Sequence, residues 1–247
     1  MKNILFTLAL LISFVSFGQT AEEYYKRGYD KAKLKDYNGA IADYNKAIEL
    51  DPNDADAYNN RGVSKDELKD YNGAIADYTK AIELNPNNTN AYYNRGVSKA
   101  ELKDYNGAIA DYTKAIELDP NDADAYNNRG YDKNELKDHN GAIADFTKAI
   151  ELDPNDAYTY YNRGASKYDL KDYNGAIADY TKAIELDPND ADAYKNRGVS
   201  KAELKDYNGA IADYTKAIEL NPNNTNAYYN RGVSKAELKD YNGAIAD

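Results

Sequence analysis

The sequence of 247 residues lacks cysteine entirely, and positive charge is scarce relative to negative charge. The absence of cysteine excludes disulfides, thiolate metal sites and thiol catalysis. The 31 Lys and Arg residues are outnumbered by 42 Asp and Glu residues, which gives a formal net charge of −11 at pH 7. A chain this acidic would be repelled by phosphate backbones, so nucleic acid is not expected as a partner.

Long apolar runs are also absent, except near the amino terminus. Residues 4–17 form an apolar run of 14 residues, which is shorter than the roughly 20 residues that a membrane-spanning helix needs. Lys2 precedes the run, and Ser16 and Gly18 are small residues at the −3 and −1 positions of a cleavage site. We therefore predict a secretory signal peptide at residues 1–18, which makes the protein exported, to the periplasm, the cell envelope or the extracellular space. An uncleaved membrane anchor is the alternative.

Internal repetition dominates the rest of the chain. The segment that begins at Ala21 recurs with a period of 34 residues. Six complete copies and one partial copy follow one another: residues 21–54, 55–88, 89–122, 123–156, 157–190, 191–224 and 225–247. Residues 55–111 and 191–247 differ at only two positions, which indicates duplication of a four-copy block.

Each copy carries the pattern of two helices joined by a turn. In residues 55–88, the second helix is indicated by a helical face of five residues: Ala74, Ile75, Tyr78, Ala81 and Ile82. Tyr58, Gly62 and Leu68 are expected along the first helix, and residues 69–73 are expected to form the turn. Pro86 cannot continue a helix and ends the pair. One such pair buries too little apolar surface to fold alone, so the copies must stack on one another.

This pattern resembles the tetratricopeptide repeat family. The family has an aromatic residue at repeat position 4, Gly at 8, Ala at 20, an aromatic residue at 24, Ala at 27 and Pro at 32. In one copy these are Tyr58, Gly62, Ala74, Tyr78, Ala81 and Pro86. The resemblance covers residues 21–247 and implies an all-α fold, a right-handed α-solenoid of helix-turn-helix repeats over residues 19–247. Together with the signal peptide, it indicates an exported protein of bacterial type.

Two repeat positions depart from the family pattern. Arginine stands at position 7, where the family has leucine, and lysine stands at position 11, where it has tyrosine, as at Arg61 and Lys65. An unpaired charge cannot be deeply buried. We therefore expect these side chains to reach solvent or to pair with acids such as Asp77 or Asp111.

Residues that could carry chemistry recur with the repeat or lack partners. Serine at position 10 occurs in five copies without a neighbouring base, which nucleophilic catalysis would need. The single histidine, His139, replaces a tyrosine of the other copies and has no converging partners special to its copy. The acidic residues 51–56 lack the glycine of a calcium-binding loop. We expect no catalytic residue, no metal site, no cofactor and no enzyme activity.

The resemblance implies that the first helix of each copy lines a concave groove. Asparagine occupies position 6 in all but the first copy: Asn60, Asn94, Asn128, Asn162, Asn196 and Asn230. Tyrosine occupies position 5 in alternate copies: Tyr25, Tyr93, Tyr161 and Tyr229. Amides can pair with an extended peptide backbone, and tyrosines offer a large contact area. These ten residues are the predicted peptide-binding residues, and acids such as Glu101 favour a neutral or basic ligand.

We therefore predict a protein-interaction scaffold that binds a protein or an extended peptide. The mature chain is expected to have no membrane span, and a homo-oligomer through its open carboxyl-terminal end is a further candidate interaction. Two alternatives stay open. The chain is a structural spacer without a groove ligand, or it is the non-catalytic amino-terminal part of a larger enzyme or envelope-assembly protein.

Overall fold

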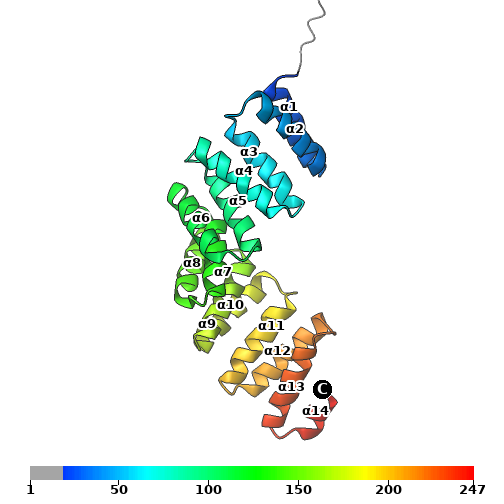
Figure 1. Cartoon of the computed structure of the whole chain (residues 1–247). Coiled ribbons are helices and arrows are strands. Elements are labelled where there is room, and N and C mark those ends of the chain that lie inside the picture. Colours follow the sequence, from blue (N-terminus) through cyan, green and yellow to red (C-terminus); the bar gives the residue numbers. More distant parts are fainter. Residues whose placement is uncertain (1–18) are drawn as a thin grey trace, which may run out of the picture.

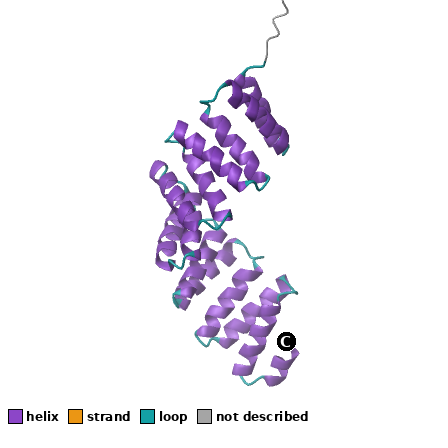
Figure 2. Cartoon of the chain, viewed as in Figure 1, coloured by secondary structure: helices purple, strands orange, loops and turns teal. Residues whose placement is uncertain are grey.

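The computed structural model describes residues 19–247, and every regular element in them is a helix (Figures 1 and 2). The helices are α1 (Ala21–Lys33), α2 (Tyr37–Leu50), α3 (Ala55–Glu67), α4 (Tyr71–Leu84), α5 (Thr89–Glu101), α6 (Tyr105–Leu118), α7 (Ala123–Glu135), α8 (His139–Leu152), α9 (Ala157–Asp169), α10 (Tyr173–Leu186), α11 (Ala191–Glu203), α12 (Tyr207–Leu220), α13 (Thr225–Glu237) and α14 (Tyr241–Ala246). The all-α prediction is confirmed. The predicted signal peptide lies outside the described residues.

Polar caps set the helix boundaries within each copy. The Asp54 side chain accepts hydrogen bonds from two backbone N–H groups of the first turn of α3, and Asp70 accepts one from Gly73 N. Because Asp70 is the cap, α4 begins at Tyr71, inside the segment predicted as a turn. Leu68 does not continue α3 as predicted but caps its carboxyl end, where it is 43% exposed. The chain reverses at Lys69, which takes a left-handed backbone conformation with φ of 63°.

Small residues allow the two helices of a pair to pack closely. Ala57 of α3 and Ala74 of α4 are fully buried, as is the ring of Tyr78. A Cβ atom at Gly62 would lie 2.7 Å from Cε1 of Tyr78, so the ring occupies the space that a larger residue on α3 would need. The same alanine, glycine and aromatic positions recur in the other pairs, which gives a thin but continuous core.

The pairs stack in chain order into an elongated, twisting solenoid (Figure 1). Each odd-numbered helix contacts the next odd-numbered helix, whereas no two even-numbered helices of residues 19–247 pack on each other. In a curved stack, the elements on the inner side are the closer ones. The odd-numbered helices therefore form the inner face of the solenoid, and the even-numbered helices form its outer face. None of the helices in residues 19–247 is both long and apolar enough to cross a membrane.

Candidate functional site

Sequence differences between the copies lie mainly on the inner face. The outer helices α4, α6, α10 and α12 have one identical sequence, and α2 and α8 depart from it only at Asn45, His139 and Phe146. The inner helices differ from one another at several positions, including the fifth, ninth, tenth and twelfth of the repeat. The outer face is thus uniform along the chain, and the inner face carries what distinguishes one copy from another.

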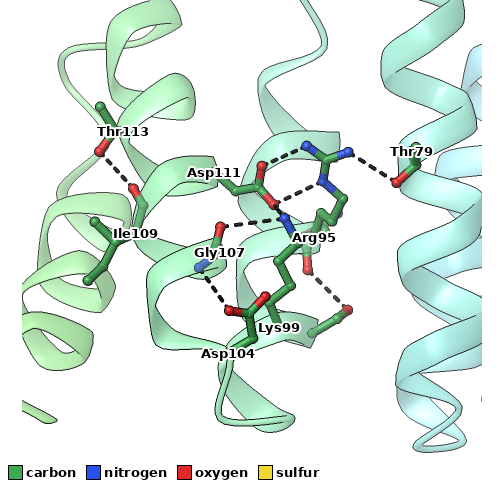
Figure 3. A network of polar contacts seen from close by, with 10 residues as sticks. Thr79, Arg95, Lys99, Asp104, Gly107, Ile109, Asp111 and Thr113 are labelled. Carbon is green, nitrogen blue, oxygen red and sulfur yellow. Dashed lines mark hydrogen bonds and ion pairs between the residues drawn. The ribbon is translucent and has the colours of Figure 1, made fainter. Parts of the chain in front are cut away.

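Charged residues that depart from the family pattern hold this face in place. In α5, the Arg95 guanidinium donates to both carboxylate oxygens of Asp111 on α6, at 2.9 and 2.7 Å (Figure 3). Its third nitrogen donates to Thr79 on α4 of the preceding copy at 3.0 Å, and Lys99 Nζ lies 2.7 Å from Asp111. Asp111 is only 4% exposed. The predicted pairing of these charges is confirmed, and it joins each pair to the one before it.

The same network recurs along the chain, and in the first copy it lowers the pKa of the buried carboxyl. Hydrogen bonds from the Arg27 guanidinium, with a contribution from Lys31 and against the opposing effect of burial, hold the pKa of the Asp43 carboxyl below its usual range. Two cations around one buried carboxylate satisfy its acceptors, so the network is structural.

The predicted peptide-binding residues pair with each other between copies. The Tyr25 hydroxyl accepts a hydrogen bond from Asn60 at 2.8 Å, and the same bond joins Asn128 to Tyr93 at 2.9 Å. The third such pair is Asn196 with Tyr161, at 2.8 Å. Each of these tyrosine rings also packs on the buried tyrosine of its own pair, with ring centroids 5.7–5.8 Å apart. The solenoid brings position 5 of one copy beside position 6 of the next, and both residues are part of the stacking interface.

The remaining predicted residues have different surroundings. Asn94 Nδ2 lies 3.5 Å from an oxygen of Asn59, a long contact. Asn162 is 8% exposed, and its Nδ2 has no hydrogen-bond partner in the described chain. Asn230 borders a cavity, and Tyr229 is 72% exposed. Binding of a peptide by these residues is not tested by the structure and stays a prediction.

Acids form a row beside these residues on the inner helices. The Tyr71 hydroxyl donates to Glu101 Oε2 at 3.3 Å. Burial, together with the charge of Glu101 and its hydrogen bond, raises the pKa of Tyr71. Burial and the charge of an equivalent acid likewise raise the pKa of three other tyrosines, Tyr105, Tyr173 and Tyr207. These carboxylates are exposed and add negative charge to the inner face.

Sequence reasoning missed a set of cavities between successive copies. One cavity, of about 400 Å³, lies between α5, α6, α7 and α9 and includes Tyr131, Asp132 and Tyr158 in its lining. Asp132 is 1% exposed and stands where five other copies have serine. The aspartate in place of serine could have been noticed in the sequence. It indicates a cavity only when the residues of neighbouring copies are placed together in the structure.

His139 lies beside one polar side chain of its own copy and one of the next copy. Its Nδ1 atom lies 2.7 Å from Asn134 Oδ1, and Asp169 is 3.7 Å away. No group of three His, Cys, Asp or Glu side chains in residues 19–247 is arranged to hold a metal ion.

Family models match most of this chain. The tetratricopeptide repeat model matches residues 55–88, 89–122, 123–156, 157–190 and 191–224. The chain belongs to the tetratricopeptide repeat family. Two further models of the family match residues 28–65 and 213–246, so the departures at positions 7 and 11 lie within a genuine tetratricopeptide solenoid.

Solved structures of the family share the architecture. YrrB, described as a TPR protein with an unusual peptide-binding site, is 27% identical over 74% of this chain and 95% of its own, with a TM-score of 0.68. MamA is 28% identical over 64% of this chain and 93% of its own, with a TM-score of 0.63. A tetratricopeptide repeat protein from Parabacteroides merdae, 22% identical over 93% of this chain and 91% of its own, shows the fold alone, with a TM-score of 0.71. Among curated proteins, no sequence matches this chain.

Proposed function

We propose that the mature protein is an exported scaffold that binds a protein or an extended peptide along the inner face of its solenoid. The observation that carries this proposal is the concentration of sequence differences between copies on the inner helices. A stack that served only as a spacer would need uniform stacking surfaces and no distinct inner face. Here the outer helices are nearly uniform, and the inner helices are not.

The chemistry of the inner face favours a neutral or basic partner. Exposed acids recur at position 13 of the copies, and Glu101 and Glu203 are two of them. A row of like charges steers a basic ligand toward the face and raises its association rate at low salt. The similarity to YrrB, whose description includes a peptide-binding site, supports polypeptide as the ligand class.

Export is proposed from the first residues of the sequence. Residues 1–18 have the charged start, the apolar run and the small-residue cleavage site of a signal peptide. Self-association through α13 and α14, where Tyr229 and Ile245 are largely exposed, is a separate prediction. Sedimentation velocity at several protein concentrations tests it.

A displayed library of random peptides tests binding to the inner face. Peptides are selected on the mature chain, and their affinities are compared for two variants with the same change in net charge. The inner variant carries Glu101→Lys and Glu203→Lys, and the outer variant carries Glu117→Lys and Glu151→Lys. All four side chains are exposed, so neither variant should affect the core.

Selected peptides should be rich in lysine or arginine and should bind the inner variant at least about tenfold more weakly, about 1.4 kcal/mol. Their affinity for the outer variant should stay close to that of the unmodified chain. Failure to select any peptide would support the spacer alternative. Loss of binding to the outer variant alone would place the binding surface on the even-numbered helices.

A further inference from the structure

Asp132 is a buried acid without a partner. Its side chain, on α7, is 1% exposed, and no group of the described chain donates a hydrogen bond to its Oδ2 atom. In five other copies the residue at this position is serine, whose hydroxyl donates to a backbone carbonyl of its own helix, as from Ser98 to Asn94 at 3.2 Å. A carboxylate cannot make that bond. A buried acceptor left without a donor destabilises the folded chain, so stability does not account for an acid at this position.

The unpartnered carboxylate borders a cavity with aromatic walls. The cavity of about 400 Å³ is lined by four tyrosines, Tyr105, Tyr112, Tyr131 and Tyr158. Tyr131 and Tyr158 are 43% and 55% exposed, so the cavity reaches solvent at the inner face. Glu101 and Lys103 complete its charged lining.

The equivalent cavity near the end of the solenoid has the same framework but different chemistry. It has a volume of about 360 Å³ and is lined by Tyr207, Tyr214, Val233 and Ser234. Val233 and Ser234 are the counterparts of Tyr131 and Asp132. The first copy has the same pair, Tyr29 and Asp30, but no helix pair precedes it in the described chain and Asp30 is exposed. Among the copies that stack on a preceding copy, only the fourth has tyrosine and aspartate at these two positions.

A neighbouring interface shows how such an acid is satisfied when no ligand is needed. Between the second and third copies, Asp66 accepts hydrogen bonds from Ser98 Oγ at 2.8 Å and from the Tyr78 hydroxyl at 3.3 Å. Asp66 thus occupies the space between the helices and is paired within it. One copy later, the residue at that position is Ala100, which leaves the space open beside Asp132.

The lining selects a compact cation with an alkyl stem. A buried carboxylate gains most from a positively charged donor, and tyrosine faces attract cations. Glu101 adds negative charge at the rim, and Lys103 is the one cation that lines the cavity. The two acids of the lining, Asp132 and Glu101, do not supply the several oxygen ligands that a divalent metal ion requires.

We propose that this cavity binds the ammonium group of a lysine side chain in a partner polypeptide, with Asp132 as its counter-ion. The proposal rests on the proposed function, because it names the residue of the basic partner that the inner face recognises. The alkyl stem of the lysine lies between Tyr131 and Tyr158, and its ammonium group donates to the Asp132 carboxylate. Asp132 then has the donor that the free chain lacks.

Binding should depend on pH. Burial, together with the charge of Glu135, raises the pKa of Asp132 to about 7. The other groups around it are Glu101, Lys103 and the tyrosines of α6, α7 and α9. Lysine binds the ionised form of the acid, so the affinity should rise between pH 6 and pH 8 and then level off.

Calorimetric titration of the mature chain with a small probe tests the cavity apart from any partner. The probe is Nα-acetyl-lysine amide, and its uncharged control is Nα-acetyl-norleucine amide. Butylamine distinguishes a free amine from a lysine in a peptide-like backbone. The variants are Asp132→Ser, which copies the cavity around Ser234, and Asp132→Asn, which keeps the shape and removes the charge. Ser234→Asp in the equivalent cavity is a control for a buried acid without Tyr131.

We expect saturable millimolar binding of the lysine probe at pH 8, at least about tenfold weaker binding to both Asp132 variants, and none of the norleucine probe. Equal affinity for all variants, or no saturable binding, overturns the proposal. Butylamine binding as tightly as the lysine probe overturns the assignment to a peptide lysine. The selection of peptides on the mature chain does not require the lysine probe to bind, so the proposed function can hold when this cavity fails. Because Glu101 lines the cavity, the Asp132 variants and not the inner variant are the test of the cavity itself, and failure of the two proposals is distinguishable.

Discussion

Replacement of Asp132 by serine should stabilise the folded chain, and the gain should grow with pH. The acid has a pKa of about 7 in the folded chain, against about 3.9 when unfolded. Between these values the folded state binds more protons than the unfolded state, so the acid destabilises the fold progressively as the pH rises from about 4 to about 7. The serine of other copies removes this effect and supplies a hydrogen bond, as Ser98 does.

The magnitude follows from the two pKa values. A difference of about three pKa units destabilises the folded chain by about 4 kcal/mol once the acid is ionised in both the folded and the unfolded chain. At pH 5 part of this destabilisation is already present, because the acid is mostly ionised in the unfolded chain. From pH 5 to pH 8 the destabilisation should therefore grow by about 2.5 kcal/mol. Asp132→Ser should therefore increase the free energy of unfolding by that much more at pH 8 than at pH 5.

Urea unfolding at the two pH values measures this difference, and amide exchange in α7 reports it locally. Asp124→Asn on the same helix is the control, because that side chain is exposed and should show no comparable difference. An equal effect of Asp132→Ser at both pH values would refute the reasoning. Asp132 would then be ionised at pH 5 in the folded chain, which requires a donor close to its carboxylate.

Three other predictions follow from the packing and the sequence. Asp111→Ala leaves Arg95 and Lys99 without their buried partner and should cost about 3–5 kcal/mol in urea unfolding; Glu117→Ala, which loses only a surface pair with Lys114, should cost under about 1 kcal/mol. Gly96→Ala places a Cβ atom 2.7 Å from Tyr112 and should cost about 1–3 kcal/mol, whereas Gly232→Ala, with its nearest atom 3.2 Å away, should cost less, and equal costs would contradict the packing account. The intact mass of the exported protein should correspond to a chain that begins at Gln19, and a mature chain that keeps Lys2 would rule out cleavage there.

The helix pairs could be predicted from the sequence because local patterns determine them. Alanine, glycine and aromatic residues at fixed spacing, and a proline at the end of each copy, define the same two helices wherever they occur. The boundaries were harder to predict, since residues 69–73 were expected to form the turn. The Asp70 side chain instead accepts a hydrogen bond from Gly73 N and caps α4, which begins at Tyr71.

Contacts between copies were harder to predict. Tyr93 and Asn128 were expected as separate ligand contacts, but the solenoid places them 2.9 Å apart, where they bond to each other. Asp132 has its environment because Ala100, Tyr131 and Tyr158 of three copies meet around one cavity. Such relations depend on how successive pairs are rotated in the stack, which the pattern within one copy does not specify.

Amide hydrogen exchange with a bound basic peptide tests the central claim most directly. The peptide comes from the library selection, and exchange is followed with and without it. We expect slower exchange in the inner helices α5, α7 and α9, and little change in the outer helices α6, α8 and α10. Slower exchange confined to the outer helices would contradict the account, because the ligand would then occupy the face on which the copies are nearly identical.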